Sequence, residues 1–164
     1  MADHAISPLF NSALETGVRA LTILAEAAPK AFDLQTLVYF DYLVVHSADA
    51  NGPKSLHPNT PLRNGELLVR RRMIQQGVLL MVSRGLVERC MNAEGISYVA
   101  TDDAVPFLDC LKSAYALSLR ERAEWAVETF GKMNAVEMQS FFEANFDCWT
   151  REFQASSSSS DSLK

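Results

Sequence analysis

Hydrophobic residues recur at helical spacing directly after residue 12. Ser12 and Glu15 have the spacing of a capping box, in which each residue satisfies a backbone N–H of the other. The apolar residues that follow at intervals of about three or four are Leu14, Val18, Leu21, Leu24 and Ala28. We predict a first helix that begins at Ser12 and ends before Pro29.

A second helix is predicted after Asp33, whose side chain is a suitable N-cap. Its apolar residues are Leu34, Leu37, Val38, Val44 and Val45, with Tyr39, Phe40 and Leu43 widening the stripe. A stripe of this width indicates burial on more than one side.

Residues 47–64 contain Gly52, Pro53, Pro58 and Pro61 and are predicted to form a long irregular loop. A third helix is predicted over residues 65–84, with an apolar stripe of Leu67, Ile74, Val78 and Met81 and a second stripe of Val69, Met73 and Leu80. We expect both stripes to be covered, by the domain or by a partner.

A β-hairpin is predicted after the third helix, because residues 86–90 and 96–100 read as strands on either side of an Asn-Ala-Glu-Gly turn. Three helices followed by a hairpin are the plan of a winged helix. The predicted fold is therefore mainly α, a winged-helix-like domain followed by C-terminal helices.

After the hairpin, Asp102 or Asp103 is expected to cap a fourth helix that places Phe107, Leu108, Leu111 and Tyr115 inward. Ser118 and Glu121 predict the start of another helix, which ends at Gly131, and a last helix begins near Asn134. The expected organisation is an N-terminal arm over 1–11, a winged-helix-like core over 12–101, a helical extension over 102–154 and a disordered serine-rich tail over 155–164.

Composition narrows the classes of function. The formal charge of −5 does not favour nonspecific nucleic-acid binding, so any DNA contact should be local. The chain has no apolar run long enough to span a membrane and no signal-peptide pattern, which predicts a cytoplasmic protein without membrane contact. Three cysteines without CxxC spacing predict reduced thiols rather than disulfides or a zinc ribbon.

The run Arg70, Arg71 and Arg72 on the third helix is the candidate for DNA-phosphate contact, because winged helices often insert this helix into the major groove. Adjacent helical residues point about 100° apart, however, so the three guanidiniums cannot form one stripe. The sequence favours ion pairs with the domain or a partner and leaves phosphate contact open.

A stripe of aromatic residues on the last helix is the candidate partner interface: Phe142, Phe146, Trp149 and Phe153. The same spacing also serves internal packing, and that alternative stays open. Leu56 and His57 in the long loop are added to the candidate interface, with His57 interpreted as a hydrogen-bonding anchor of the loop.

No catalytic residue is assigned. The three histidines lack the grouping that metal ligands use, and the sequence has no phosphate-binding loop, dinucleotide fingerprint or nucleophile elbow. We therefore expect no enzyme activity, no metal and no cofactor.

Several stretches resemble a known family. They are the DYLVVHS run at 41–47, the LHP segment at 56–58, the RNGELLVRR helix start at 63–71 and the RERAEW segment at 120–125. Over about residues 8–133 the chain resembles the middle component of bacterial ABC-three-component systems, and that family is similar to the small third subunit of Lamassu-type antiphage systems.

The resemblance implies an accessory subunit that links an SMC/Rad50-like ABC ATPase to an effector, often a nuclease, and that meets double-stranded DNA through the complex. The alternative is a free-standing winged-helix transcriptional regulator. That role requires a basic recognition surface, which the acidic composition does not favour.

Overall fold

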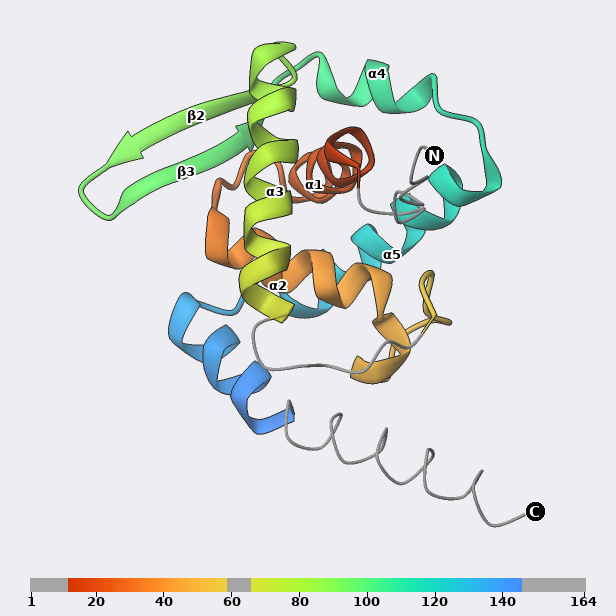
Figure 1. The fold of residues 1–164 in the computed structure, drawn as a ribbon, viewed down its shortest axis with the longest axis vertical. Coiled ribbons are helices and arrows are strands. Elements are labelled where there is room, and N and C mark those ends of the chain that lie inside the picture. Colours follow the sequence, from red (N-terminus) through yellow and green to blue (C-terminus); the bar gives the residue numbers. More distant parts are fainter. Residues whose placement is uncertain (1–11, 59–65, 146–164) are drawn as a thin grey trace, which may run out of the picture.

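The computed structural model describes residues 12–58 and 66–145 of the chain. Three helices form the centre of the molecule, α1 (Ala13–Ala27), α2 (Leu34–Val45) and α3 (Glu66–Ser83). In Figure 1, α3 lies in front and crosses both α1 and α2. The predicted starts of the first two helices are confirmed, because Ser12 and Glu15 form a reciprocal capping box and the Asp33 side chain accepts a bond from the Thr36 N–H.

The two helices α1 and α3 cross at a pair of glycines. A Cβ atom added at Gly17 would lie 2.7 Å from the carbonyl oxygen of Gly77, and one added at Gly77 would lie 2.5 Å from the backbone nitrogen of Gly17. Both distances are shorter than any real Cβ contact. The helices therefore meet backbone to backbone, with no room for a side chain between them.

A three-stranded antiparallel sheet has the order β1-β3-β2. The hairpin of β2 (Val87–Asn92) and β3 (Gly95–Ala100) confirms the predicted wing, and Figure 1 shows it projecting beside α3. The third strand, β1 (Phe32–Asp33), was not predicted, and it pairs Phe32 with Tyr98 of β3. With this strand the fold has the predicted winged-helix-like, mainly helical plan.

The helices after the hairpin differ from the prediction. Helix α4 (Ala104–Asp109) is short, and α5 (Ala114–Phe130) begins at the Ser113 N-cap. The predicted capping box at Ser118 and Glu121 is wrong, because both residues lie inside α5. Tyr115 consequently belongs to α5 rather than α4.

Helix α5 joins the C-terminal half to the core. It packs against both α1 and α2, and its buried residues are Leu119, Ala123, Ala126 and Phe130. Helix α2 contacts α1, α3 and α5. The wide apolar stripe predicted for α2 is therefore buried, as expected. Gly131 ends α5 as predicted.

A further helix covers residues 135–145. Asn134 caps it in a reciprocal pair with Glu137, which confirms the predicted start. The 1–11 arm, the 155–164 tail, Phe146, Trp149 and Phe153 lie outside the described residues.

Two predicted apolar stripes are only partly covered. On α3, Ile74, Val78 and Met81 are buried, whereas Val69 of the second stripe is 62% exposed. On α1, Leu14 is 58% exposed. The long loop is also less irregular than predicted, because Ser47–Ala50 form a 3₁₀ helix.

In the described part of the chain, no helix is both long enough and apolar enough to cross a membrane.

Candidate functional site

The three consecutive arginines of α3 point to different surroundings. Arg70 is directed into the domain, where its Nη1 lies 2.6 Å from Oδ2 of Asp41. Arg71 donates from Nη1 to Oε1 of Gln35 at 2.7 Å, and Arg72 is exposed. One arginine of the run is thus presented to solvent, and the other two make bonds to α2.

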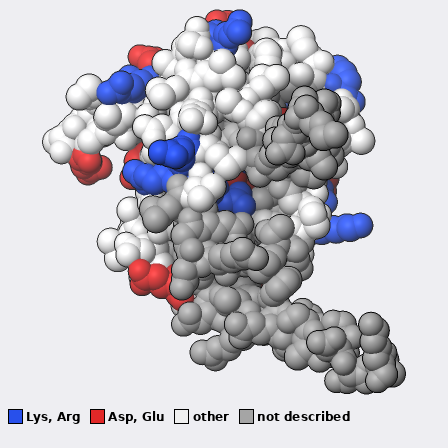
Figure 2. Space-filling model, in the orientation of Figure 1, with Lys and Arg blue, Asp and Glu red and all other residues white. Residues whose placement is uncertain are grey.

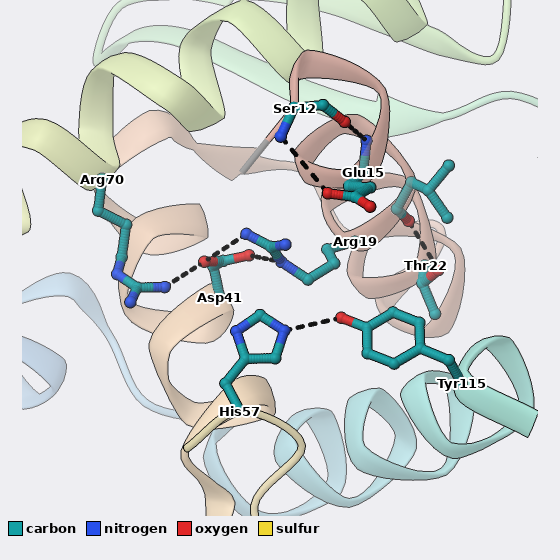
Figure 3. Close-up of polar contacts among 9 residues, drawn as sticks. Ser12, Glu15, Arg19, Thr22, Asp41, His57, Arg70 and Tyr115 are labelled. Carbon is teal, nitrogen blue, oxygen red and sulfur yellow. Dashed lines mark hydrogen bonds and ion pairs between the residues drawn. The ribbon is translucent and has the colours of Figure 1, made fainter. Parts of the chain in front are cut away.

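Asp41 is the centre of a buried ion-pair network. Its Oδ1 lies 2.7 Å from Nε of Arg19, and its Oδ2 accepts from both Arg19 and Arg70 (Figure 3). Asp41 and Arg19 are 1% and 2% exposed. Burial alone would raise the pKa of Asp41, but the two guanidiniums outweigh it and lower the pKa to about 2. One carboxylate of α2 thereby fixes side chains of α1 and α3.

Two histidines lie beside this network and are held neutral. Nε2 of His57 is 2.9 Å from the hydroxyl of Tyr115, and the His46 and His57 rings are 6.4 Å apart (Figure 3 draws His57 and Tyr115). Burial lowers the pKa of each to about 4, and Arg19 and Arg70 reinforce the shift. In the described residues, Nδ1 of His46 is buried without a hydrogen-bond partner.

One face of α5 fastens the loop that follows α2. Trp125 packs so closely on Gly52 that a Cβ there would overlap the indole ring. Arg122 donates through Nε and Nη2 to the carbonyl of Lys54 at 3.1 and 2.9 Å. With Tyr115 on His57, three positions of α5 hold the loop along its length.

The candidate interface residues Leu56 and His57 lie in this fastened loop. Both backbone N–H groups donate to the carbonyl of Val45, and the Leu56 side chain packs against the core. His57 anchors the loop through Tyr115, which is the structural role expected of it. Both residues are half-buried.

The outer face of α3 carries exposed apolar side chains. Residues at steps of three and four, Val69, Arg72, Gln76 and Leu79, are exposed there, with Val69 at 62% and Leu79 at 45%. On the wing, Met91 is 77% exposed and is paired across the strands with Ile96. Figure 2 shows this side of the molecule as mostly uncharged over its described atoms, with separate basic and acidic groups. We use the name α3–wing surface for these exposed residues on two neighbouring elements, Val69, Arg72 and Leu79 of α3 and Met91 and Ile96 of the hairpin.

In the described residues, no set of three or more His, Cys, Asp or Glu side chains is placed to hold a metal ion. Cys90 is half-buried and Cys110 is exposed, and both are free thiols.

The first member of the aromatic stripe lies in the core. Phe142 is 2% exposed, stacks on Tyr39 at 4.4 Å and meets Tyr42 edge-on. Phe142 therefore serves internal packing rather than an exposed interface.

Sequence reasoning did not find the Arg19, Asp41 and Arg70 network. The available signal was a charged residue inside an apolar stripe on each of two predicted helices. Burial of an unpaired charge is so costly that each implies an opposite partner. Nothing in the local pattern identifies that partner.

The fold and these surfaces define a small winged-helix-like protein in which the ion-pair network of Arg19, Asp41 and Arg70 joins the three central helices. Residues 9–152 match the family model of the ABC-three component (ABC-3C) system Middle Component 2, which spans most of the chain. The chain therefore belongs to the Middle Component 2 family and is a component of a system with partner subunits. No curated protein and no solved structure matches it.

Proposed function

We propose that this protein is a non-catalytic adaptor that links an SMC/Rad50-like ABC ATPase to an effector nuclease in an antiphage or anti-plasmid defence complex. Membership in a three-component family supplies the partner subunits. The observation that carries the proposal is the α3–wing surface, where apolar side chains occupy the face that a DNA-reading winged helix would direct at the groove.

The chemistry of this surface favours protein over DNA. Burial of apolar area drives most protein association, and exposed apolar groups at a helix face are typical anchors for it. Phosphate contact needs several cations, whereas Arg70 is committed to Asp41 and Arg71 to Gln35. Arg72 remains the candidate for a local phosphate contact when the assembled complex binds double-stranded DNA.

A second surface is proposed at the C-terminal end. Trp149 and Phe153 continue the helical spacing of Phe142, and aromatic residues are favoured as interface anchors. We assign Phe146, Trp149 and Phe153 to a partner interface that is separate from the α3–wing surface.

The test is co-purification of the complete three-component system after co-expression of its subunits. Val69→Asp with Leu79→Asp should abolish capture of the ATPase, because charged side chains would be buried without partners in the interface. The matched control is Val105→Asp with Val136→Asp, two exposed apolar positions on other helices, at 46% and 72%.

Equal capture by both double variants, with circular dichroism unchanged, would exclude the α3–wing surface as the docking site. A mobility-shift assay with the isolated protein and its own promoter separates the adaptor from a free-standing regulator. Sequence-specific, salt-resistant binding by the isolated chain would overturn the adaptor function.

A further inference from the structure

An apolar cleft of about 630 Å³ lies on the side of the molecule where α1 and α5 begin. Its apolar lining comes from Leu14 and Val18 of α1, from Leu119 of α5 and from Leu111. Tyr115, Glu15, Lys112 and Cys110 also line it. The cleft is separate from the α3–wing surface, because no residue of that surface lines it.

Leu14 is an exposed apolar residue at the cleft. It is 58% exposed although it lies in the first turn of α1, on the edge of the cleft. Nearby Leu117 is 55% exposed. Apolar walls with an exposed leucine at the mouth are the normal setting for an apolar segment that packs across them.

We propose that residues 6–10 of this same chain, Ile-Ser-Pro-Leu-Phe, occupy the cleft and form part of the domain. The chain enters α1 at Ser12, so this segment ends at Phe10, only four residues before Leu14, which lines the cleft. Ser12 is extended, with φ −71° and ψ 155°, and its capping box fixes the direction in which the chain reaches the helix.

Length and composition of the segment fit the cleft. Five extended residues reach about 17 Å, which exceeds the usual 8–10 Å between packed helices. Ile6, Leu9 and Phe10 supply apolar side chains, and Pro8 favours the extended backbone required to cross two helices. The family match also begins at residue 9, so Leu9 and Phe10 belong to the matched region.

Cysteine cross-linking in the full chain tests the placement, because Cys110 lines the cleft and is an exposed free thiol. With Cys90 and Cys148 replaced by serine, single cysteines are introduced in turn at Ile6, Pro8, Leu9 and Phe10, with Ala2→Cys as the control. A docked segment should give intrachain disulfides at one or two positions at least about tenfold faster than at their neighbours, because disulfide geometry is strict.

Thermal unfolding supplies the second measurement. Leu9→Ser with Phe10→Ser should lower Tm by about 5 °C, because two buried apolar side chains are lost. Ala2→Ser with Ala5→Ser should leave it unchanged. The proposal is overturned if the disulfide rate falls smoothly with distance from Ser12, if the disulfides form between chains, or if the Leu9 and Phe10 substitutions leave Tm unchanged.

Discussion

Arg70 of α3 is paired at 2.6 Å with Asp41 of α2, and the same carboxylate holds Arg19 of α1 at 2.7 Å. The first arginine of an Arg-Arg-Arg run is thus a half-buried residue that is paired with the domain's own core. This pairing sets which side of α3 faces the core and which side is exposed.

Substitution of Asp41 by Asn should destabilise the domain strongly. Two guanidiniums would lose their counter-charge in a site where Arg19 is 2% exposed, and a broken buried pair typically costs about 3–5 kcal/mol. Urea unfolding measures the loss. Asp109→Asn is the control, because Asp109 pairs with Arg120 in a partly exposed bridge worth about 1 kcal/mol or less. Similar losses for both variants would contradict a buried network.

Gly77→Ala should destabilise the protein, although alanine in a helix interior is more favourable than glycine by about 1 kcal/mol. The new Cβ would meet the backbone of Gly17, and overpacking of this kind costs about 1–3 kcal/mol or more. Gln76→Ala, at an exposed position of the same helix, should be neutral or slightly stabilising. Thermal unfolding of the two variants compares them, and a higher Tm for Gly77→Ala would disprove the close crossing.

Acidification should weaken the fold between pH 6.5 and 4. The folded pKa of His46 and His57 is about 4, below the ordinary value of 6.5, so the unfolded chain binds more protons in this window. The stabilisation that comes from keeping both imidazoles neutral is fully present above pH 6.5. It is lost progressively as the pH falls from 6.5 to 4. For the buried His46 the loss at pH 4 is about 3 kcal/mol at most.

The loss of stability can be measured as a fall in Tm between pH 7 and pH 4. His57→Gln should reduce the slope of Tm against pH, whatever its effect at neutral pH. An unchanged slope would show that His57 does not titrate abnormally. Asp41 contributes a separate loss below about pH 4, because its pKa is lowered to about 2.

The aromatic residues at the C-terminal end should divide into two groups. Phe142→Ala should cost about 3–5 kcal/mol of folding stability, because the side chain is 2% exposed and packs on Tyr39. Trp149→Ala with Phe153→Ala should preserve Tm but abolish capture of a partner subunit by the tagged protein. A large fall in Tm for the second variant would instead assign both residues to internal packing.

Arg72→Glu should affect DNA binding of the assembled complex and little else. If Arg72 contacts one phosphate, the slope of log K against log salt should fall by about 1. Arg84→Glu, just beyond the end of α3, is the matched charge reversal. Equal slopes for the wild type and Arg72→Glu would remove Arg72 from the DNA interface.

The sequence predicted those elements whose signals are local. The Ser12 and Glu15 capping box, the Asp33 and Asn134 caps and the turn of the wing each act within a few residues. The same reasoning failed at Ser118 and Glu121, whose spacing is identical to a capping box. There Ser113 already caps the helix, and Leu119 continues its buried face.

The buried network was beyond local reasoning for a different reason. Asp41 is 22 residues from Arg19 and 29 from Arg70, and only the packing of three helices brings the side chains together. Likewise β1 has two residues and is defined by its pairing with β3. Pairings of this kind depend on the completed fold.

The glycine contact between α1 and α3 affects how a partner bound to α3 would be positioned relative to the other helices. Backbone lies against backbone at Gly17 and Gly77, and Arg70 is paired with Asp41 of α2, so α3 is joined directly to both of the other central helices. In the adaptor proposed above, a partner bound to the outer face of α3 would therefore be held in a fixed position relative to α1 and α2.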